Sequence, residues 1–332
     1  MLWVFQILLL LGLVACAEVP NSQISGLEYL YNSTNGDGWN WIPDYANYGI
    51  PWNFSAVDDS VSNPCVDRWQ GIQCSTNCTT DSSITTCNIT TIFLMNFNLI
   101  GTLPPQIGLL PQLNNLILFK NELYGSVPTE ISLMTELHVF NVSKNMLTGA
   151  VFDTLLSNHQ LGVISVSDNK FEGTIPNSVY AQQPGLAVLV GYNNSFTGTI
   201  PATVGQIGDL QVFYFAFNKL TGGIPTQLGS LSALMILSLD FNSLHGTIPN
   251  ELGSLTTLEV LSLYSLGLEG TIPSTLMSMP ALYAIALSFN ELTGTIPTTL
   301  GTLSSLIFFG VAENFLTGSV DGLAELSKLP RI

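Results

Sequence analysis

Charged residues are scarce in this chain of 332 residues. Only 9% of them are charged, and 7 Lys and Arg stand against 23 Asp and Glu, which gives a formal net charge of −16. Binding to nucleic acid or to an anionic membrane surface needs clustered cations. The composition therefore argues against both kinds of partner, and it suits cationic partners or simple solubility.

Residues that catalysis uses are few and scattered. The three histidines are His138, His159 and His245, and no Ser/His/Asp or Cys/His set can be assembled around them from the sequence. Asp58 and Asp59 are adjacent, so their side chains point apart, and no glycine-rich phosphate loop is present. We therefore expect neither enzymatic activity nor a cofactor.

Long hydrophobic runs are missing except at the N terminus. Residues 2–14 are apolar but too few to cross a bilayer, and Ala15-Cys16-Ala17 fits a cleavage site between small residues. We expect a signal peptide over residues 1–17, a mature chain from Glu18, and no transmembrane anchor in it. Leu13-Val14-Ala15-Cys16 also resembles a bacterial lipoprotein box, which stays open as an alternative.

Cysteine is rare as well, with five in the chain. Cys16 falls in the predicted signal peptide, whereas Cys65, Cys74, Cys78 and Cys87 cluster further along. Four cysteines in a secreted chain favour disulfides and allow three connectivities. A zinc site is the alternative, although no histidine lies nearby.

Beside these absences stands a regular repeat. A glycine recurs every 24 residues, with one step of 25 from Gly173 to Gly198. The ten glycines are Gly101, Gly125, Gly149, Gly173, Gly198, Gly222, Gly246, Gly270, Gly294 and Gly318. A period this regular predicts a solenoid, which presents a long open surface rather than a closed catalytic pocket.

One repeat shows the expected local structure. In Leu234–Pro249, LMILSLDFNSLHGTIP, Leu237 and Leu239 alternate with Ser238 and Asp240, the period of a strand with one buried face. An asparagine ends the strand four residues before the glycine, where stacked amides would bond the backbone of adjacent turns. This ladder reads Asn121, Asn145, Asn169, Asn194, Asn218, Asn242, Asn290 and Asn314.

Two turns lack the ladder residue. Phe97 and Leu266 stand in its place, and we expect a looser bend at each. At the first of them, Asn96 or Asn98 is a candidate substitute for the missing amide.

These residues carry a family resemblance. The pattern LxxLxLxxNxLTGxIP, as in LQVFYFAFNKLTGGIP (Leu210–Pro225) and LYAIALSFNELTGTIP (Leu282–Pro297), resembles the plant-specific extracellular class of leucine-rich repeat over roughly residues 65–330. The resemblance implies an α/β solenoid, a right-handed superhelix of about ten repeats with a parallel sheet on its concave face. Members of the class include receptor-like kinase ectodomains, receptor-like proteins, and inhibitors of secreted polygalacturonases.

The segment before the repeats resembles the N-terminal cap of such proteins. Residues 22–33 place apolar side chains on one helical face, and NSTNGDGWNW follows. Asp37 in that segment is interpreted as part of a turn, because the spaced carboxylates of a calcium loop are missing. A cap here would cover the apolar edge of the first repeat.

The cysteine cluster resembles the end of this cap. PCVDRWQGIQC (Pro64–Cys74) is similar to the family motif CxWxGVxC with two extra residues, which implies a Cys65–Cys74 disulfide and leaves Cys78 with Cys87. The predicted cap covers residues 18–90 and the repeats cover residues 91–332.

Two columns of the repeat, eight and six residues before each glycine, are expected to be exposed on the concave face. Most of their residues are small, but Tyr192, Tyr214, Asp240 and Tyr264 stand out on four consecutive turns. Adjacent strands lie about 4.8 Å apart, so the four would span about 15 Å. Because Tyr anchors many interfaces, we predict that these residues bind a protein, peptide or glycan; alternatively, Tyr is simply favoured on a sheet surface.

Three phenylalanines lie close to these columns. Phe217, Phe241 and Phe289 stand five residues before a glycine, where the resemblance implies structural filling. We therefore leave them out of the predicted site.

Six sequons are candidate glycosylation sites, in keeping with secretion from a eukaryotic cell. They are at Asn32, Asn53, Asn77, Asn88, Asn141 and Asn193. Asn141 lies in the column eight residues before a glycine. A glycan there would obstruct the N-terminal part of the concave face and push recognition toward the tyrosines.

A row of threonines suggests a rival function. The residue after the glycine is Thr102, Thr174, Thr199, Thr247, Thr271 or Thr295 in six turns. Regular hydroxyl and methyl groups can bind ice, and some members of this repeat class do so. Ser126, Ala150, Gly223 and Ser319 interrupt the row, and LTGTIP is ordinary for the class.

The repeat pattern stops in phase at Ile332, so we expect the repeats to be incomplete at the C-terminal end. An uncapped apolar end favours self-association, and a co-receptor is a further expected partner. We predict a recognition module that is secreted or on the outer face of the plasma membrane: a ligand-sensing ectodomain or secreted receptor-like protein in signalling or defence. An inhibitor of a secreted cell-wall hydrolase is the alternative, against which the scarcity of cations counts.

Overall fold

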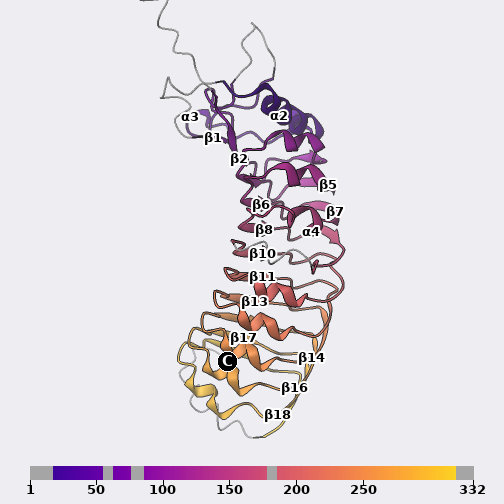
Figure 1. The fold of residues 1–332 in the computed structure, drawn as a ribbon, viewed down its shortest axis with the longest axis vertical. Helices are drawn as coiled ribbons and strands as arrows, with labels where there is room; N and C mark the ends of the chain where they lie inside the picture. Colours follow the sequence, from indigo (N-terminus) through magenta and orange to yellow (C-terminus); the bar gives the residue numbers. More distant parts are fainter. Residues whose placement is uncertain (1–17, 55–62, 76–85, 178–184, 319–332) are drawn as a thin grey trace, which may run out of the picture.

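The computed structural model describes residues 18–54, 63–75, 86–177 and 185–318. In them the chain forms a curved solenoid whose turns stack from the N-terminal cap to the last described repeat (Figure 1). The predicted signal peptide and the end of the predicted repeats lie outside the described residues. Among the described residues, no helix is long and apolar enough to cross a membrane.

One long sheet lines the concave side of the solenoid (Figure 1). Its eleven strands are β1 (Ile72–Cys74), β2 (Ile89–Phe93), β4 (Asn115–Ile117), β6 (Val139–Asn141), β8 (Val163–Ser165), β10 (Val188–Val190), β11 (Val212–Tyr214), β13 (Ile236–Ser238), β15 (Val260–Ser262), β17 (Ala284–Ala286) and β19 (Phe308–Gly310). Every neighbouring pair is parallel except β1 with β2. The predicted concave parallel sheet is therefore confirmed.

Short strands and helical turns make up the other sides. One set of strands is β3 (Ile100–Gly101), β5 (Glu122–Ser126), β7 (Met146–Ala150) and β9 (Lys170–Glu172). A second set is β12 (Thr221–Gly222), β14 (Ser243–Thr247), β16 (Gly267–Thr271), β18 (Glu291–Gly294) and β20 (Phe315–Leu316). The helical turns are η2 (Pro105–Leu109), η3 (Thr129–Leu133), α4 (Phe152–Leu155), η5 (Ala202–Gln206), η6 (Thr226–Ser230), η7 (Asn250–Ser254), η8 (Ser274–Ser278) and η9 (Thr298–Thr302).

The asparagine ladder joins each turn to the turn before it. The Asn218 side-chain amide donates to the carbonyls of Gly191 and Phe215 at 2.9 and 3.0 Å, and its oxygen accepts from the Phe196 backbone N–H at 3.0 Å. The other seven predicted ladder residues make equivalent bonds across the turns: Asn121, Asn145, Asn169, Asn194, Asn242, Asn290 and Asn314. Polar groups inside the bend therefore find partners without water.

The two turns without a ladder asparagine have Phe97 and Leu266 in its place. Phe97 is buried, and its N–H reaches the Asn121 side chain of the next turn. Asn98 donates instead to the Gly38 carbonyl of the cap, so it does not substitute for the missing amide. Beside Leu266, Ser265 keeps the left-handed conformation and donates to the Ser288 carbonyl at 3.0 Å. Backbone bonds between turns are thus present at both places, and the looser bend stays a prediction.

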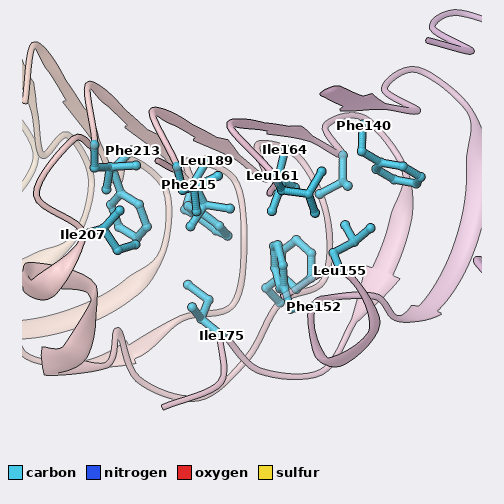
Figure 2. Close-up of a cluster of buried hydrophobic side chains, with 14 of the residues drawn as sticks. Phe140, Phe152, Leu155, Leu161, Ile164, Ile175, Leu189, Ile207, Phe213 and Phe215 are labelled. Carbon is cyan, nitrogen blue, oxygen red and sulfur yellow. The ribbon is translucent and has the colours of Figure 1, made fainter. Parts of the chain in front are cut away.

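The hydrophobic core runs along the interior of the solenoid (Figure 2). Leucines of the strands and of the helical turns are fully buried through most of the stack. Aromatic rings contribute to the core near the middle of the solenoid. The ring centroids of Phe152 and Phe196 are 4.8 Å apart, and those of Phe213 and Phe215 are also 4.8 Å apart. This continuous core fixes which columns of the repeat face outward.

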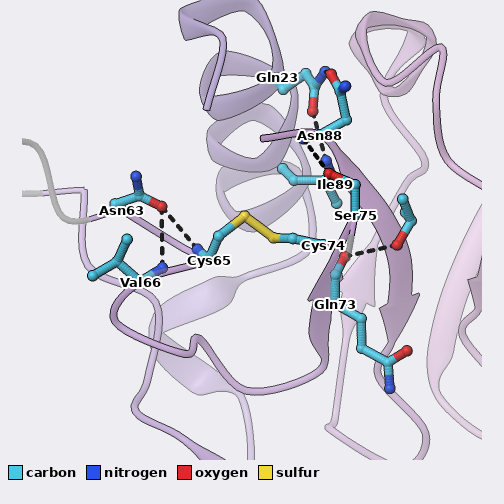
Figure 3. Close-up of a disulfide and its surroundings, with 10 residues drawn as sticks. Gln23, Asn63, Cys65, Val66, Gln73, Cys74, Ser75, Asn88 and Ile89 are labelled. Carbon is cyan, nitrogen blue, oxygen red and sulfur yellow. Dashed lines mark hydrogen bonds between the residues drawn. A yellow bond between two sulfur atoms is a disulfide. The ribbon is translucent and has the colours of Figure 1, made fainter. Parts of the chain in front are cut away.

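The cap packs on the first turns through one helix and a disulfide. Helix α2 (Asn21–Ser33) buries Leu27 and Leu30, and α3 (Tyr45–Tyr48) and the single turn η1 (Gly36–Gly38) follow it. Figure 3 shows the disulfide between Cys65 and Cys74, the pairing that the family resemblance implies. Zinc coordination by these two thiolates is therefore excluded. Cys78 lies outside the described residues, so its pairing with Cys87 stays a prediction.

The cap also contains a packed aromatic cluster. Its rings lie 4.8 to 6.4 Å apart and belong to Tyr31, Trp39, Trp41, Trp52, Phe54 and Trp69. Asp37 accepts a hydrogen bond from the Tyr31 hydroxyl at 2.9 Å, within the tight turn that the sequence indicates.

We expect Asn218→Ala to lower the free energy of unfolding by about 2–4 kcal/mol, because two carbonyls and one N–H in a buried bend lose their partner. Asn250→Ala is the matched control: Asn250 is exposed, and its loss should change stability by less than about 0.5 kcal/mol. Urea denaturation measures both. Equal destabilisation by the two variants would contradict a stabilising role for the ladder.

Candidate functional site

Six exposed or half-buried aromatic rings form a continuous strip on the concave side. The rings of this aromatic strip belong to Tyr192, Tyr214, Phe217, Phe241, Tyr264 and Phe289. Ring centroids of successive members lie 4.3 to 5.5 Å apart. The three predicted tyrosines therefore share one surface, but phenylalanines connect them.

The interpretation of the three phenylalanines as structural filling is wrong. Phe217, Phe241 and Phe289 are 43, 41 and 48% exposed. Each has a positive φ of 52 to 59°, which turns the chain at the end of the concave strand and directs the side chain outward. The sequence pattern does not show the backbone φ of these residues, so their exposure could not be predicted from it.

The backbone conformation makes these phenylalanines conspicuous. A residue with a side chain rarely adopts positive φ, and a bulky ring there is less favourable than Asn or Asp. Exposing a large apolar ring adds a second cost, since its burial would have been favourable. The positive φ recurs at this position on the other described turns and so belongs to the repeat, whereas an exposed apolar ring stands there on these three turns.

Asp240 has a different role from the one expected of a free ligand contact. Its carboxylate accepts hydrogen bonds from the Ser238 and Ser262 hydroxyls at 3.0 and 2.7 Å, and from the Tyr264 backbone N–H at 2.7 Å. Asp240 therefore ties the β13 turn to the neighbouring β15 turn and positions Tyr264 in the aromatic strip.

The column six residues before the glycine is less exposed than expected. Ser143, Ser167, Ala216 and Ser288 are almost fully buried there, because small side chains lie below the larger ones around them. The Ser143 hydroxyl bonds the Ser165 hydroxyl at 2.7 Å. The Ser167 hydroxyl is buried without a partner among the described residues. The few large side chains of this column thus stand among small, buried ones.

The strip lowers the acidity of one of its tyrosines. Burial raises the pKa of the Tyr214 phenol above its ordinary value, and the nearby Tyr192, Asp240 and Asp168 raise it further. The phenol therefore stays protonated at neutral pH and can donate a hydrogen bond to a ligand.

Two predicted glycosylation sites lie on this side of the molecule. The Asn141 side chain is half-buried and accepts from the Ser143 N–H at 3.0 Å. Asn193 is exposed beside the aromatic strip and donates to Asp168 at 2.8 Å. A glycan at Asn193 would cover one end of the strip. Of the other four, Asn77 lies outside the described residues, and all six stay predictions.

The threonine row lies along the second set of short strands, such as β14 and β16, and not along the concave sheet. Thr247, Thr271 and Thr295 are exposed, and each methyl group lies against the glycine of the next turn. A Cβ at Gly270 would approach the Thr247 methyl to 3.0 Å, so the glycine makes room for the threonine. Part of the regularity of the row thus has a packing cause.

The described residues contain no group of three His, Cys, Asp or Glu side chains that could hold a metal ion. His138 bonds the Gln160 carbonyl at 3.0 Å, in a different part of the repeat from His245. The aromatic strip is thus the candidate site that geometry supports.

Comparisons with known proteins agree with this architecture. The family model of the leucine-rich repeat matches residues 233–255. A solved structure described as the plant peptide hormone receptor RGFR1 in complex with RGF2 is 35% identical, with a TM-score of 0.69 over 71% of this chain and 38% of that chain. The PEPR1–AtPEP1 structure is 27% identical, with a TM-score of 0.76 over 94% and 44%.

The chain belongs to the leucine-rich repeat family. Its repeats are of the plant extracellular type. A plant ice-binding protein is also similar, at 26% identity and a TM-score of 0.72 over 91% of this chain and 89% of that one. This leucine-rich repeat chain spans less than half the length of the two receptors. No curated protein matches it.

Replacing Asp240 should lower the pKa of Tyr214, but not as far as the ordinary value of a tyrosine. Asp240→Asn removes one negative charge that disfavours the phenolate, but burial, the largest cause, remains. NMR titration of ¹³C-labelled tyrosine, assigned with Tyr214→Phe, measures the pKa. Asp209→Asn, at an exposed acid outside the strip, is the control and should leave it unchanged. A return to the ordinary value in Asp240→Asn would show that charge, and not burial, is the main cause.

Proposed function

We propose that the chain is an extracellular recognition module that binds an extended peptide along the aromatic strip, and that it has no catalytic activity of its own. The observation that carries the proposal is the exposure of six contacting rings, three of them in a backbone conformation that disfavours such side chains. Rigid aromatic side chains supply large contact area at little entropic cost.

The packing of the rings favours a peptide over a glycan. Phe217 and Phe241 stack on each other at 4.3 Å with an interplanar angle of 28°, so part of each ring face is already covered. Edges project from such a stack, and they fit the aliphatic and aromatic side chains of a peptide. A sugar ring would need an uncovered ring face to stack upon.

The similar structures support this choice of ligand. RGFR1 and PEPR1 were solved in complexes described as containing RGF2 and AtPEP1, and the first is described as a peptide hormone receptor. Likeness to these structures and the disulfide in the cap support an extracellular location for this chain. A role in signalling or defence is part of the same proposal.

The test uses a library of random dodecapeptides selected on the full chain. We expect selected peptides to bind the Phe217→Ala/Phe241→Ala variant and the Tyr264→Ala variant about tenfold or more weakly than the unaltered chain, because interface rings contribute much of the binding energy. Isothermal calorimetry measures the affinities.

Matched controls are Tyr29→Ala and Tyr124→Ala, whose rings are 50 and 49% exposed but lie outside the strip. Affinity should be unaffected in both. Undiminished binding by both strip variants would refute the proposal.

Ice binding is a second candidate, favoured by the exposed threonine row and by likeness to a plant ice-binding protein over most of both chains. If it is correct, Thr271→Lys should abolish thermal hysteresis, since a long charged side chain would break the flat row. The control is Thr226→Lys, at an exposed threonine in η6. No hysteresis and no recrystallisation inhibition by the unaltered chain would remove this candidate. Inhibition of a pectin-degrading enzyme would instead favour the hydrolase inhibitor.

A further inference from the structure

Charge is segregated along the concave side of the solenoid. Each turn presents a segment from eleven to five residues before its glycine, which holds the strand and the left-handed residue after it. In the first three turns (residues 90–96, 114–120 and 138–144) these segments contain Lys120 and Lys144 and no acid. In the later turns they contain acids and no Lys or Arg: Asp168, Asp240, Glu259 and Glu313.

The cationic end carries exposed apolar side chains as well. Phe93 and Met95 are 42 and 44% exposed in the first turn, and Phe93 pairs in register with Ile117 of the second. The Lys144 ammonium lies 5.6 Å from the centre of the Phe119 ring.

A pocket of about 340 Å³ adjoins this surface where the cap meets the first strand. Arg68, Trp69, Tyr48 and Phe93 are among the residues that line it, together with the Cys65–Cys74 disulfide. The lining combines aromatic and aliphatic side chains with polar ones and one guanidinium, which suits an apolar side chain next to an anionic group.

The charges around the pocket leave Arg68 available. Its side chain is exposed and makes no hydrogen bond or ion pair with a described residue. Asp67 accepts a hydrogen bond from the Asn63 backbone N–H at 2.7 Å. Asp44 accepts from the Asn47 side chain at 2.7 Å. Although the chain has a net charge of −16, an anionic ligand at this end of the concave side would lie near the cations Arg68, Lys120 and Lys144.

We propose that the first three turns and the adjoining pocket form a second subsite, which binds the acidic and apolar end of the same peptide and thereby fixes its direction along the solenoid. The inference rests on the proposed function. The acidic end of the peptide lies over Arg68, Lys120 and Lys144, and its remaining apolar or basic side chains lie over the aromatic strip and its acids.

The span from the outer end of one subsite to the outer end of the other sets the length of a ligand that fills both. From Phe93 in the first turn to Phe289 in the ninth there are eight steps of about 4.8 Å, or about 38 Å. An extended chain advances about 3.3 Å per residue, so about 12 residues reach both ends. A shorter peptide would leave part of one subsite empty.

The experiment compares selected dodecapeptides with their reversed sequences on the full chain. We expect an acidic residue beside an apolar one at a constant end of the selected peptides, and about tenfold weaker binding by each reversed sequence, whose composition is identical. Lys120→Glu and Lys144→Glu should each weaken binding about tenfold, by placing an anion opposite the acidic end.

Lys170→Glu is the matched control, one turn further along, where the lysine belongs to β9 and not to the concave sheet. It should change the affinity less than about twofold. Peptides that lose affinity in Phe217→Ala/Phe241→Ala but are indifferent to reversal and to Lys144→Glu would overturn this inference and leave the proposed function standing. If no peptide is enriched at all, the proposed function fails, and the second subsite fails with it.

Discussion

Hydrogen bonding from one turn to the next is the constraint on which the rest of this structure depends. A turn of 24 residues has a bend whose carbonyls and N–H groups point inward, where no water reaches them. The Asn218 side chain satisfies three of these groups at once. Its amide NH₂ donates to the Gly191 and Phe215 carbonyls, and its oxygen accepts from the Phe196 N–H. Because each ladder residue needs the turn beside it, no turn is stable alone, and the core must be continuous.

The same bend creates the surface that the site uses. The residue before each ladder position takes a positive φ, as Phe217 and Phe241 do, so its side chain leaves the core at every turn. Backbone hydrogen bonds between turns accompany this conformation whatever the side chain is: Lys144, Asp168 and Phe289 all adopt it. Since folding sets the conformation and not the residue type, this column is free to vary with the ligand.

The sequence was sufficient for whatever depends on period and on apolar pattern. It predicted the stacked turns, the concave parallel sheet, and the positions at which Asn121 to Asn314 bond adjacent turns. Half of the aromatic strip could be found in this way, because Tyr192, Tyr214 and Tyr264 stand in expected columns. Phe217 was missed because its exposure follows from φ. Asp240 was misjudged because two of its three partners, Ser262 and Tyr264, lie on the next turn, and the sequence does not show that its carboxylate bonds them.

An open solenoid has no closed cavity in which a few contacts could select a ligand. Selectivity must therefore come from the order of different contacts along its axis. Apolar contacts alone would let an extended ligand shift by one turn, since neighbouring turns offer similar rings. Charges that differ between the two ends penalise such a shift, as the opposite charge then meets the wrong end. With only 9% of its residues charged, the chain keeps Lys120 and Lys144 of the early turns apart from the acids of the later turns along one surface.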